Sequence, residues 1–315
     1  MHLRVSLDLD MEQIRKVAEV LRSLNITPDN FTDPRFYPSP TDDEEHVLGY
    51  FFAMVAIDHR THYPRPYVLK IGEEEYRGAD LLWRLGKELY DRDPEFFTAR
   101  RLSELDEETV RKWLCPDGVQ LWDINIRTFL LRDLGYKVLT FYEGAFIKIV
   151  KKSNKRLYNN GEGFVERLKI FRAFEDPVEK KAFLLVKFLY RRRLLQIEDI
   201  ENLEVPVDNH LVRIAYRLGI VKINEELLKL IKNHVELPLD LDIEIRKTVR
   251  KAWKLISKNA NMDPTVLDDF LWSHGRRTCT QQEPKCHTCP LRNICKAHME
   301  GEYITEHVHT LTWYY

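Results

Sequence analysis

Four cysteines near the end of the sequence constrain this chain more strongly than any other feature. Cys279, Cys286, Cys289 and Cys295 follow the spacing Cys-x6-Cys-x2-Cys-x5-Cys, in a segment that has almost no apolar run. Such a short loop cannot bury enough surface to fold alone, so a cross-link must hold it together. Four thiolates at this spacing bind a structural zinc ion or an iron–sulfur cluster. A pair of disulfides is the alternative, although nothing else in the sequence indicates a secreted protein.

The length and composition predict a globular protein. The chain has 315 residues, of which 44% are hydrophobic and 31% charged. No apolar run approaches the length of a membrane span, and the first nine residues are too short and too acidic for a signal peptide. We therefore expect a cytoplasmic protein without a membrane partner, and we expect a monomer.

The two halves of the sequence differ in charge. The formal net charge is −1, which argues against a uniformly basic nucleic-acid binder. Residues 1–150 contain 20 Lys and Arg against 27 Asp and Glu, whereas residues 151–315 contain 29 against 23. Phosphate contacts, if the protein makes them, are expected in the second half.

The apolar periodicity predicts a mainly α-helical fold with one small N-terminal β-hairpin. The hairpin is expected over residues 67–76, with its turn at Gly72, and Gly135 is expected to end a helix. Predicted helices cover residues 11–23, 45–57, 79–91, 107–114, 121–134, 225–233, 242–258 and 265–274.

Three domains are expected from these patterns. Residues 1–150 would form a mixed, mainly helical domain, residues 151–275 a helical core, and residues 276–315 the cysteine loop with an aromatic tail that docks on the protein. The first boundary is placed near the charged run 148–156, which is either a solvated link or a phosphate-contacting loop. Its Lys151 and Lys152 are therefore candidate DNA contacts.

Two neighbouring lysines follow a strong helix-start signal. Asp176 is expected as the N-cap and Pro177 as the first helical residue, which puts Lys180 and Lys181 in the first or second turn. The positive end of a helix lowers the pKa of an amine, and a lowered pKa is what a nucleophilic lysine needs. The alternative is two exposed lysines without a catalytic role.

The segment from Pro206 to Gly219 reads as a short capped helix. Asp208 is expected as its N-cap and Gly219 as its C-terminal glycine. Physically, Asp208 could be an N-cap and nothing more.

The Pro206–Gly219 segment and the cysteine loop resemble segments of the helix-hairpin-helix (HhH-GPD) superfamily of DNA glycosylases. The string from Val207 through His210 to Gly219 is similar to the segment that holds the family's catalytic aspartate. The cysteine spacing, with its Cys-Pro-Leu-x-x-x-Cys ending, resembles the cluster loop of the endonuclease III and adenine-glycosylase branch. The resemblance implies two helical subdomains and a 4Fe-4S cluster in place of zinc, held by the four cysteines.

The resemblance also implies a reaction. Asp208 would stabilise the positive charge that develops on the sugar as the glycosidic bond breaks. The substrate would be a modified or mispaired base flipped out of double-stranded DNA, in base excision repair. In members with lyase activity a lysine attacks the sugar, which places that role at Lys180, with Lys181 as a neighbour that could replace it. His210, Arg276 and Arg277 become candidate DNA contacts.

The chain departs from this family before the lysine helix. Members usually carry a glycine-rich hairpin there whose amides grip a phosphate. Residues 174–177 of this chain contain no glycine and two acids. The archaeal 8-oxoguanine glycosylase branch has a comparably altered hairpin, so Lys180 stays a candidate.

A second resemblance covers more of the chain. The order of its hairpin, helices and terminal tyrosines is similar to that of the queuosine nucleoside N-glycosylase (salvage) family. Those proteins share the aspartate, cleave 7-deazaguanine nucleotides and generally lack the cluster loop. The aromatic base-binding segment expected near residues 58–63 is replaced here by Asp58-His59-Arg60-Thr61-His62.

These observations leave three functions open. The first is a DNA N-glycosylase, with or without lyase activity, and the second an N-glycosylase for a 7-deazaguanine-type nucleoside or nucleotide. The third is a non-catalytic DNA-binding protein stapled by its cluster. Candidate pocket residues are His59, His62, Trp122 and Asn125.

Overall fold

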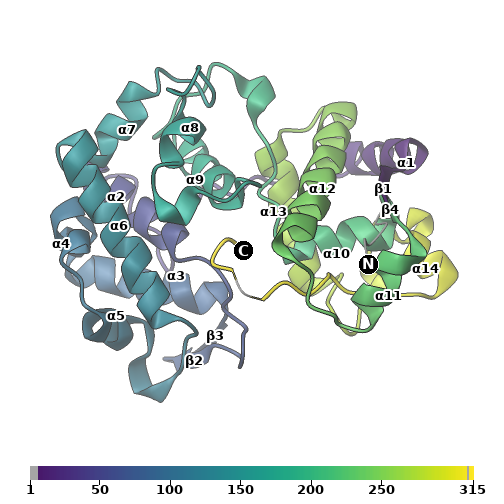
Figure 1. The fold of residues 1–315 in the computed structure, drawn as a ribbon, viewed down its shortest axis with the longest axis horizontal. Coiled ribbons are helices and arrows are strands. Elements are labelled where there is room, and N and C mark those ends of the chain that lie inside the picture. The colour runs from purple at the N-terminus through teal and green to yellow at the C-terminus, as the bar shows by residue number, and fades with distance from the viewer. Residues whose placement is uncertain (1–5, 311) are drawn as a thin grey trace. The chain divides into compact units, whose positions relative to one another are not determined.

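The computed structural model describes residues 6–310 and 312–315, which form two compact, mainly helical units (Figure 1). Unit 1 contains the described residues of Met1–Pro28 and Leu203–Thr312. Unit 2 contains Asp29–Asn202 and Trp313–Tyr315. This division differs from the boundaries expected near residues 150 and 276. The packing of the first helix and of the charged run 148–156 explains the difference.

Unit 1 is built from helices and one two-stranded antiparallel sheet. The strands β1 and β4 pair with Leu7 opposite Ile223, so the start of the chain is fixed to its second half. The elements are β1 (Leu7–Leu9), α1 (Met11–Arg22), α10 (Asn209–Leu218), β4 (Val221–Ile223), α11 (Glu225–Lys232), α12 (Leu239–Ala260), α13 (Pro264–Arg277) and α14 (Lys296–Glu300).

Helix α1 explains why the N-terminal residues belong to unit 1. Its apolar stripe, which includes Ile14, Val17 and Leu21, is completely buried, and the helix packs on α12. Burial of such a stripe contributes about 1.5–3 kcal/mol per large side chain. The carboxylate of Asp10 caps α1 by accepting a hydrogen bond from the Gln13 amide at 3.0 Å. The N-terminal segment is therefore part of the core formed by α10, α12 and α13.

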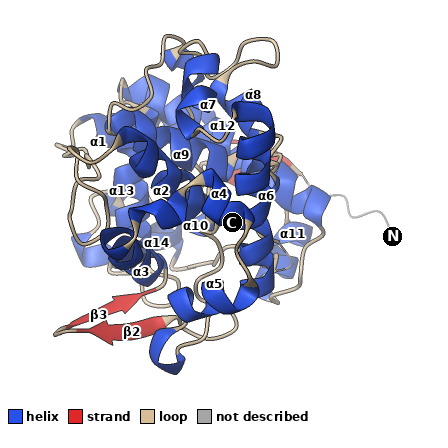
Figure 2. Ribbon diagram, turned by 90° about the vertical axis from the view of Figure 1, so that its left-hand side faces the viewer, coloured by secondary structure: helices blue, strands red, loops and turns tan. Residues whose placement is uncertain are grey.

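Unit 2 consists of helices and the predicted hairpin, which projects beside α3 in Figure 2. Strands β2 and β3 pair antiparallel, with Val68 opposite Arg77. The elements are α2 (Glu44–Ala56), β2 (Val68–Ile71), β3 (Glu74–Arg77), α3 (Ala79–Arg92), α4 (Ala99–Ser103), α5 (Glu107–Leu114), α6 (Ile124–Tyr142), α7 (Phe146–Lys152), α8 (Phe164–Leu168) and α9 (Lys180–Arg191).

Helix α2 forms the centre of unit 2. All its residues from position 47 to position 56 are buried, as the nearly continuous apolar run predicted. The ring of Phe51 stacks on Phe188 of α9 with centroids 5.4 Å apart, and Tyr50 meets Trp83 of α3 edge to face at 5.9 Å.

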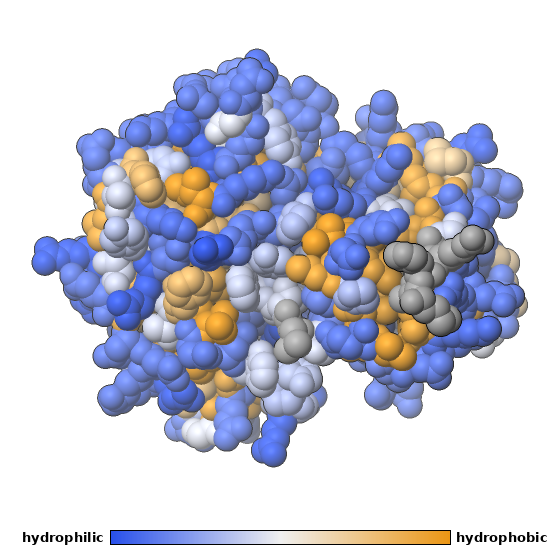
Figure 3. All heavy atoms as spheres, in the orientation of Figure 1, coloured by the Kyte–Doolittle hydropathy of each residue, from blue (hydrophilic) through white to orange (hydrophobic). Residues whose placement is uncertain are grey.

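The face of the protein in Figure 3 is mostly hydrophilic, with scattered hydrophobic patches.

The helix predicted over residues 121–134 is longer and begins later than expected. Helix α6 runs from Ile124 to Tyr142, so the prediction that Gly135 ends it is wrong. Gly135 is buried where α6 crosses α4. A β-carbon at this position would lie 2.5 Å from the Ala99 carbonyl oxygen and 2.4 Å from the Ser103 nitrogen. The glycine therefore permits close packing of two helices.

Replacing Gly135 with alanine is expected to lower the free energy of unfolding by about 1–3 kcal/mol, as overpacking does in other cores. The added methyl group would meet backbone atoms, which cannot move aside cheaply. Gly86→Ala is the matched control, because the three atoms nearest to its β-carbon all belong to the flexible side chain of Met54. Chemical denaturation should show a larger loss for Gly135→Ala than for Gly86→Ala, and equal stability of the two variants would contradict this account.

The lysine helix also begins differently from the prediction. Helix α9 starts at Lys180, and Glu179 in front of it is in the left-handed conformation (φ 60°), so Asp176 is not the N-cap. The Asp176 carboxylate accepts a hydrogen bond from the Val178 amide at 2.8 Å and stabilises the turn before the helix. Lys180 and Lys181 nevertheless lie in the first turn, as expected.

The charged run 148–156 is not a link between the units. Its first part lies in α7, and the turn after it passes through Asn154 and Lys155 in the left-handed conformation. Ser153 is fully buried and its hydroxyl donates to the Val150 carbonyl at 2.6 Å. The run therefore belongs to the body of unit 2, which explains why the predicted boundary does not coincide with the spatial one.

The remaining predicted helices are present, and two of them, α12 and α13, are longer than expected. The aromatic tail is docked on unit 2, since the Arg60 amide donates to the Tyr315 carbonyl at 3.1 Å and the Trp313 indole donates to the Arg172 carbonyl at 3.2 Å.

Within the described part of the chain, none of the helices has both the length and the apolar character needed to cross a membrane.

Candidate functional site

Asp208 is held at the N-terminus of α10 in the predicted capping position. Its carboxylate oxygen Oδ1 accepts a hydrogen bond from the Leu211 amide at 3.0 Å, and Gly219 (φ 73°) ends the helix. The side chain is half-buried. Among the described residues, the oxygen Oδ2 accepts no hydrogen bond. One oxygen therefore fixes the carboxylate while the other is available to a substrate.

The next turn of α10 is fixed to α13. The Arg213 guanidinium donates to the His210 Nδ1 atom at 2.9 Å and to the Gly275 carbonyl at 2.8 Å, and it forms an ion pair with Glu306 at 2.8 Å. Burial lowers the pKa of His210, so its imidazole is neutral near pH 7. His210, predicted to contact DNA, is thus half-buried and already bonded to Arg213.

The four cysteines line one small cavity, which they share with Arg217, His298 and Tyr303. Four soft thiolate donors that share one site are the ligand set of an iron–sulfur cluster or of a structural zinc ion. Without metal, burial raises the pKa of the Cys289 thiol to about 11. All five cysteines of the chain are free, which excludes the disulfide alternative in this structure.

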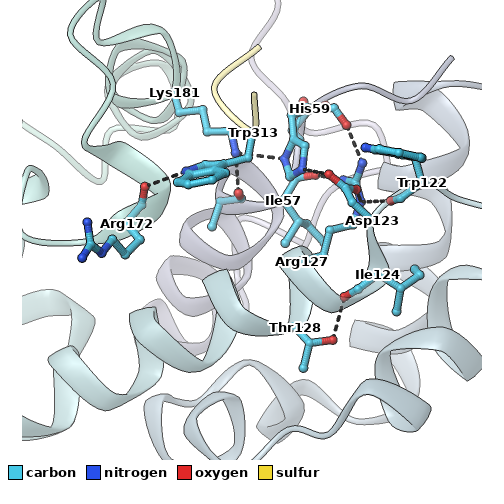
Figure 4. A network of polar contacts seen from close by, with 12 residues as sticks. Ile57, His59, Trp122, Asp123, Ile124, Arg127, Thr128, Arg172, Lys181 and Trp313 are labelled. Carbon is cyan, nitrogen blue, oxygen red and sulfur yellow. Dashed lines mark hydrogen bonds and ion pairs between the residues drawn. The ribbon is translucent and has the colours of Figure 1, made fainter. Parts of the chain in front are cut away.

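A second cluster of polar residues lies inside unit 2 (Figure 4). The Lys181 amine donates to the Ala56 carbonyl at 2.6 Å and lies 3.0 Å from His59 Nδ1. On the other edge of the ring, His59 Nε2 lies 3.1 Å from the Asp123 carboxylate. We call Lys181, His59, Asp123 and Arg127 the buried network. The amine on one side and the carboxylate on the other select the imidazole tautomer that carries its hydrogen on Nε2.

Arg127 completes the buried network. Its guanidinium pairs with Asp123 at 3.1 Å, one helical turn earlier, and donates to the backbone carbonyls of Ile57 and His59. Burial lowers the pKa of His59, and the positive charges of Arg127 and Lys181 lower it further. Burial likewise lowers the pKa of Lys181, with added repulsion from Lys180 and Arg127. The network thus holds a lysine whose amine is readily deprotonated.

The two adjacent lysines differ in access. The Lys181 side chain is fully buried, whereas Lys180 retains 8% exposure, and its amine donates to the Asp58 carbonyl at 3.2 Å. The alternative of two exposed lysines is therefore excluded. Lys180 is the lysine of the pair that a substrate could reach.

The predicted pocket residues do not form one group. His59 is buried in the network, while Trp122 is exposed and meets Tyr63 edge to face at 5.1 Å. His62 is exposed and packs near Gly78. Asn125 faces a different groove along α6, which it lines with Phe129 and Tyr136. Asn125 comes two residues after Asp123, and residues two apart on a helix point in different directions, so the Asn125 side chain faces away from the buried network.

The predicted DNA contacts are all on helices. Lys151 and Lys152 are exposed at the end of α7, and the Lys152 amine lies 5.4 Å from the centroid of the Tyr142 ring. Arg276 and Arg277 lie in the last turn of α13, where the Arg276 guanidinium stacks over Trp272 at 4.3 Å. Exposed lysines and a stacked arginine are compatible with phosphate or base contacts.

Sequence reasoning missed Asp123 and Arg127 as site residues. They are spaced four apart, the spacing of a helical ion pair, but so are many exposed pairs in this chain. The position of Arg127 within an otherwise apolar helical face was the one sequence signal that could have indicated that this arginine is buried.

These features define a mainly helical protein with a capping aspartate whose second oxygen is free and a four-cysteine cavity. The chain belongs to the queuosine salvage protein family, whose family model matches residues 38–294. That range contains Asp208, both lysines and the buried network. The family that resembled the chain only diffusely at the level of motifs is therefore the one to which it belongs.

Individual relatives include proteins with two different names. A queuosine 5'-phosphate N-glycosylase/hydrolase of Dictyostelium discoideum is 24% identical over 213 residues, which cover 61% of this chain and 64% of that protein. The chain thus spans somewhat less than two thirds of this relative. An endonuclease III of Sulfolobus acidocaldarius is 25% identical over 195 residues, 62% of this chain and 72% of that protein. A structure of an endonuclease III–DNA covalent intermediate has a TM-score of 0.48 and 13% identity, over 92% of this chain and 95% of that one.

Proposed function

We propose that this protein is an N-glycosylase that hydrolyses the glycosidic bond of a 7-deazaguanine-type nucleoside or nucleotide. The observation that carries the proposal is the family match over residues 38–294, which contains Asp208 with one carboxylate oxygen free. The name of the Dictyostelium relative supports the same substrate class.

Asp208 suits the chemistry of such a substrate. As the bond between the base and the sugar breaks, positive charge builds on the sugar ring, and a fixed carboxylate stabilises it. Water then adds to the sugar carbon, and the base leaves with a proton. A 7-deazapurine has carbon where guanine has N7, so the base cannot be activated by protonation at that atom. Stabilisation of the sugar by Asp208 should therefore matter more than for an ordinary purine.

Direct measurement of base release tests the proposal. Purified protein would be incubated with a 7-deazaguanine nucleoside and its 5'-phosphate, and in parallel with duplex oligonucleotides that each carry one modified base. Release of the free base from the nucleoside or nucleotide alone is the expected result. Release from duplex DNA alone would overturn this proposal in favour of the second candidate.

The second candidate is removal of a damaged or mispaired base from DNA. The cysteine loop and the similarity to the Sulfolobus endonuclease III favour it. A DNA enzyme contacts several phosphates, so its affinity falls steeply with salt concentration, whereas a nucleotide enzyme makes few such contacts. Binding of a duplex oligonucleotide at 50 and 200 mM salt distinguishes the two candidates.

If the second candidate holds, Lys180 and not Lys181 is expected to form the covalent adduct of a lyase reaction. Lys180 retains exposure, while Lys181 is enclosed by Ala56 and His59. Borohydride reduction during turnover of lesion DNA should trap protein on DNA in the wild type and in Lys181→Met, but not in Lys180→Ala. Trapping that survives in Lys180→Ala would contradict the assignment, and an active wild type without any trapped adduct would be monofunctional.

We also propose that the four cysteines hold a 4Fe-4S cluster. The four cysteines line one shared cavity, which supports a common metal group, and the resemblance of their spacing to the endonuclease III-type cluster loop supports the cluster over zinc. The role of the cluster would be structural, because the thiolates tie the loop to α10 and α13. Anaerobically purified protein is expected to be brown, with about four iron atoms per chain. Cys286→Ala should lose that iron, and a colourless protein that contains zinc would contradict the proposal.

A further inference from the structure

We propose that Arg217 positions the metal group of the cysteine loop, both by shaping the loop and by contributing a hydrogen bond and a positive charge at Cys279. Tyr303 and His274 supply further hydrogen bonds at two other thiolates. The proposal rests on the cluster assignment above and does not depend on which glycosidic substrate the protein cleaves.

Arg217 contacts the loop through every nitrogen of its guanidinium group. Its Nε donates to the Ile304 carbonyl at 2.8 Å, and its terminal nitrogens donate to the carbonyls of Thr280 at 2.6 Å and Gln281 at 2.7 Å. One terminal nitrogen also lies 3.4 Å from the Cys279 sulfur. A planar guanidinium with fixed donors can hold two separate stretches of backbone in register, which a lysine cannot do. The loop is thus shaped by a side chain of α10.

The charge of Arg217 indicates an anionic group in the cavity. The side chain is 1% exposed and an arginine is effectively always protonated. Within the described residues no carboxylate pairs with it, whereas Arg213, one turn earlier on α10, pairs with Glu306 at 2.8 Å. A buried charge without a counter-charge costs several kcal/mol. Thiolates bound to a cluster would supply the missing negative charge next to this guanidinium.

Two other side chains reach the sulfurs. The Tyr303 hydroxyl lies 3.5 Å from the Cys286 sulfur and is oriented by His298 Nδ1 at 3.0 Å. His274 Nε2 lies 3.5 Å from the Cys289 sulfur, and its ring stacks on Phe270 with centroids 5.1 Å apart. Three of the four cysteines therefore have a polar side chain within hydrogen-bonding reach. Hydrogen bonds to cluster sulfurs help set the reduction potential.

Arg217→Lys and Arg213→Lys form a matched pair for the test. Both variants keep the charge and lose the planar donors. Arg213 contacts the cysteine loop through one hydrogen bond to the Cys279 carbonyl at 3.0 Å, whereas Arg217 donates to two loop carbonyls and also reaches the Cys279 sulfur. Iron release to a chelator, followed by the loss of the visible absorption, is expected to be about 10- to 100-fold faster in Arg217→Lys than in the wild type. Arg213→Lys should stay close to the wild-type rate. Equal rates in the two variants, or a wild-type rate in Arg217→Lys, would overturn the proposal.

Tyr303→Phe provides an independent measurement if Arg217→Lys does not fold. This variant keeps the ring that lies 5.9 Å from the Arg217 guanidinium and removes only the hydroxyl. Its iron content should equal that of the wild type, while its reduction potential should be more negative because one hydrogen bond to sulfur is lost. An unchanged potential would overturn the role of Tyr303. Wild-type iron content and base release are measured in parallel, so failure of the cluster assignment or of the proposed function appears separately.

Discussion

Asp208→Asn is expected to lower the rate of base release by about 100- to 1,000-fold, the range seen when one preorganised electrostatic group is removed from an active site. Asparagine has nearly the same shape but no negative charge, so it cannot stabilise the positive charge on the sugar. Asparagine caps helices about as well as aspartate, so α10 should remain intact and the free energy of unfolding should change by less than about 0.5 kcal/mol. Single-turnover kinetics with whichever substrate releases its base in the assay described above measures the effect.

Asp106→Asn is the control for this experiment. Asp106 caps α5 in the same way, accepting a hydrogen bond from the Thr109 amide at 2.7 Å, but it lies outside the candidate site. It should retain full activity. If Asp208→Asn releases base at the wild-type rate, Asp208 is only a helix cap and the proposed mechanism is wrong. The same result would reopen the interpretation of the chain as a non-catalytic binding protein.

Lys181→Ala is expected to lower the free energy of unfolding by about 3–5 kcal/mol. The change leaves a cavity in the core and removes the donor to the Ala56 carbonyl and to His59 Nδ1. Lys181→Met separates the two contributions, because methionine refills most of the volume without replacing the donor. It should cost about 1–3 kcal/mol. Urea unfolding of both variants tests the ranking, and wild-type stability of Lys181→Ala would show that the network is not structural.

The pH dependence of stability gives a further test of the same residue. The pKa of Lys181 in the folded protein lies below its ordinary value of 10.5, so folding releases a proton from this amine. The unfolded chain then binds more protons, and stability increases as pH rises toward 10.5, by up to about 1.4 kcal/mol per pH unit. The advantage of the wild type over Lys181→Met should therefore grow between pH 7 and pH 9. A difference that is constant with pH would mean that Lys181 is charged in the fold.

Local signals in the sequence predicted those features that depend on neighbouring residues. Asp208 and Gly219 bound α10 as expected, because an N-cap carboxylate and a left-handed glycine act within a few residues of themselves. The apolar run of α2 likewise predicted a fully buried helix. The spacing of the four cysteines predicted a shared site, and the structure places all four around one cavity. Patterns of this kind require no knowledge of distant parts of the chain.

Features that depend on contacts between distant segments were not predictable in this way. Gly135 looks like a helix terminus in sequence, and only the crossing of α4 over α6 shows that it is a packing residue. Lys181 meets His59 across 122 positions of the chain, and Asp123 joins them from a third segment. The burial that lowers the pKa of Lys181 comes from those segments and not from its place in the first turn of α9, because Lys180 lies in the same turn.

The sequence by itself thus determined the helical class of the protein, the capping position of Asp208 and the grouping of the four cysteines at one site. The tertiary structure decided which of two adjacent lysines is accessible and which arginine of α10 faces the cysteine sulfurs. Arg213 and Arg217 are one turn apart and both are buried, yet among the described residues only Arg213 of the two has a carboxylate partner. Helix caps and the spacing of the cysteines depend on short stretches of sequence, whereas burial and charge pairing arise only when distant segments pack together.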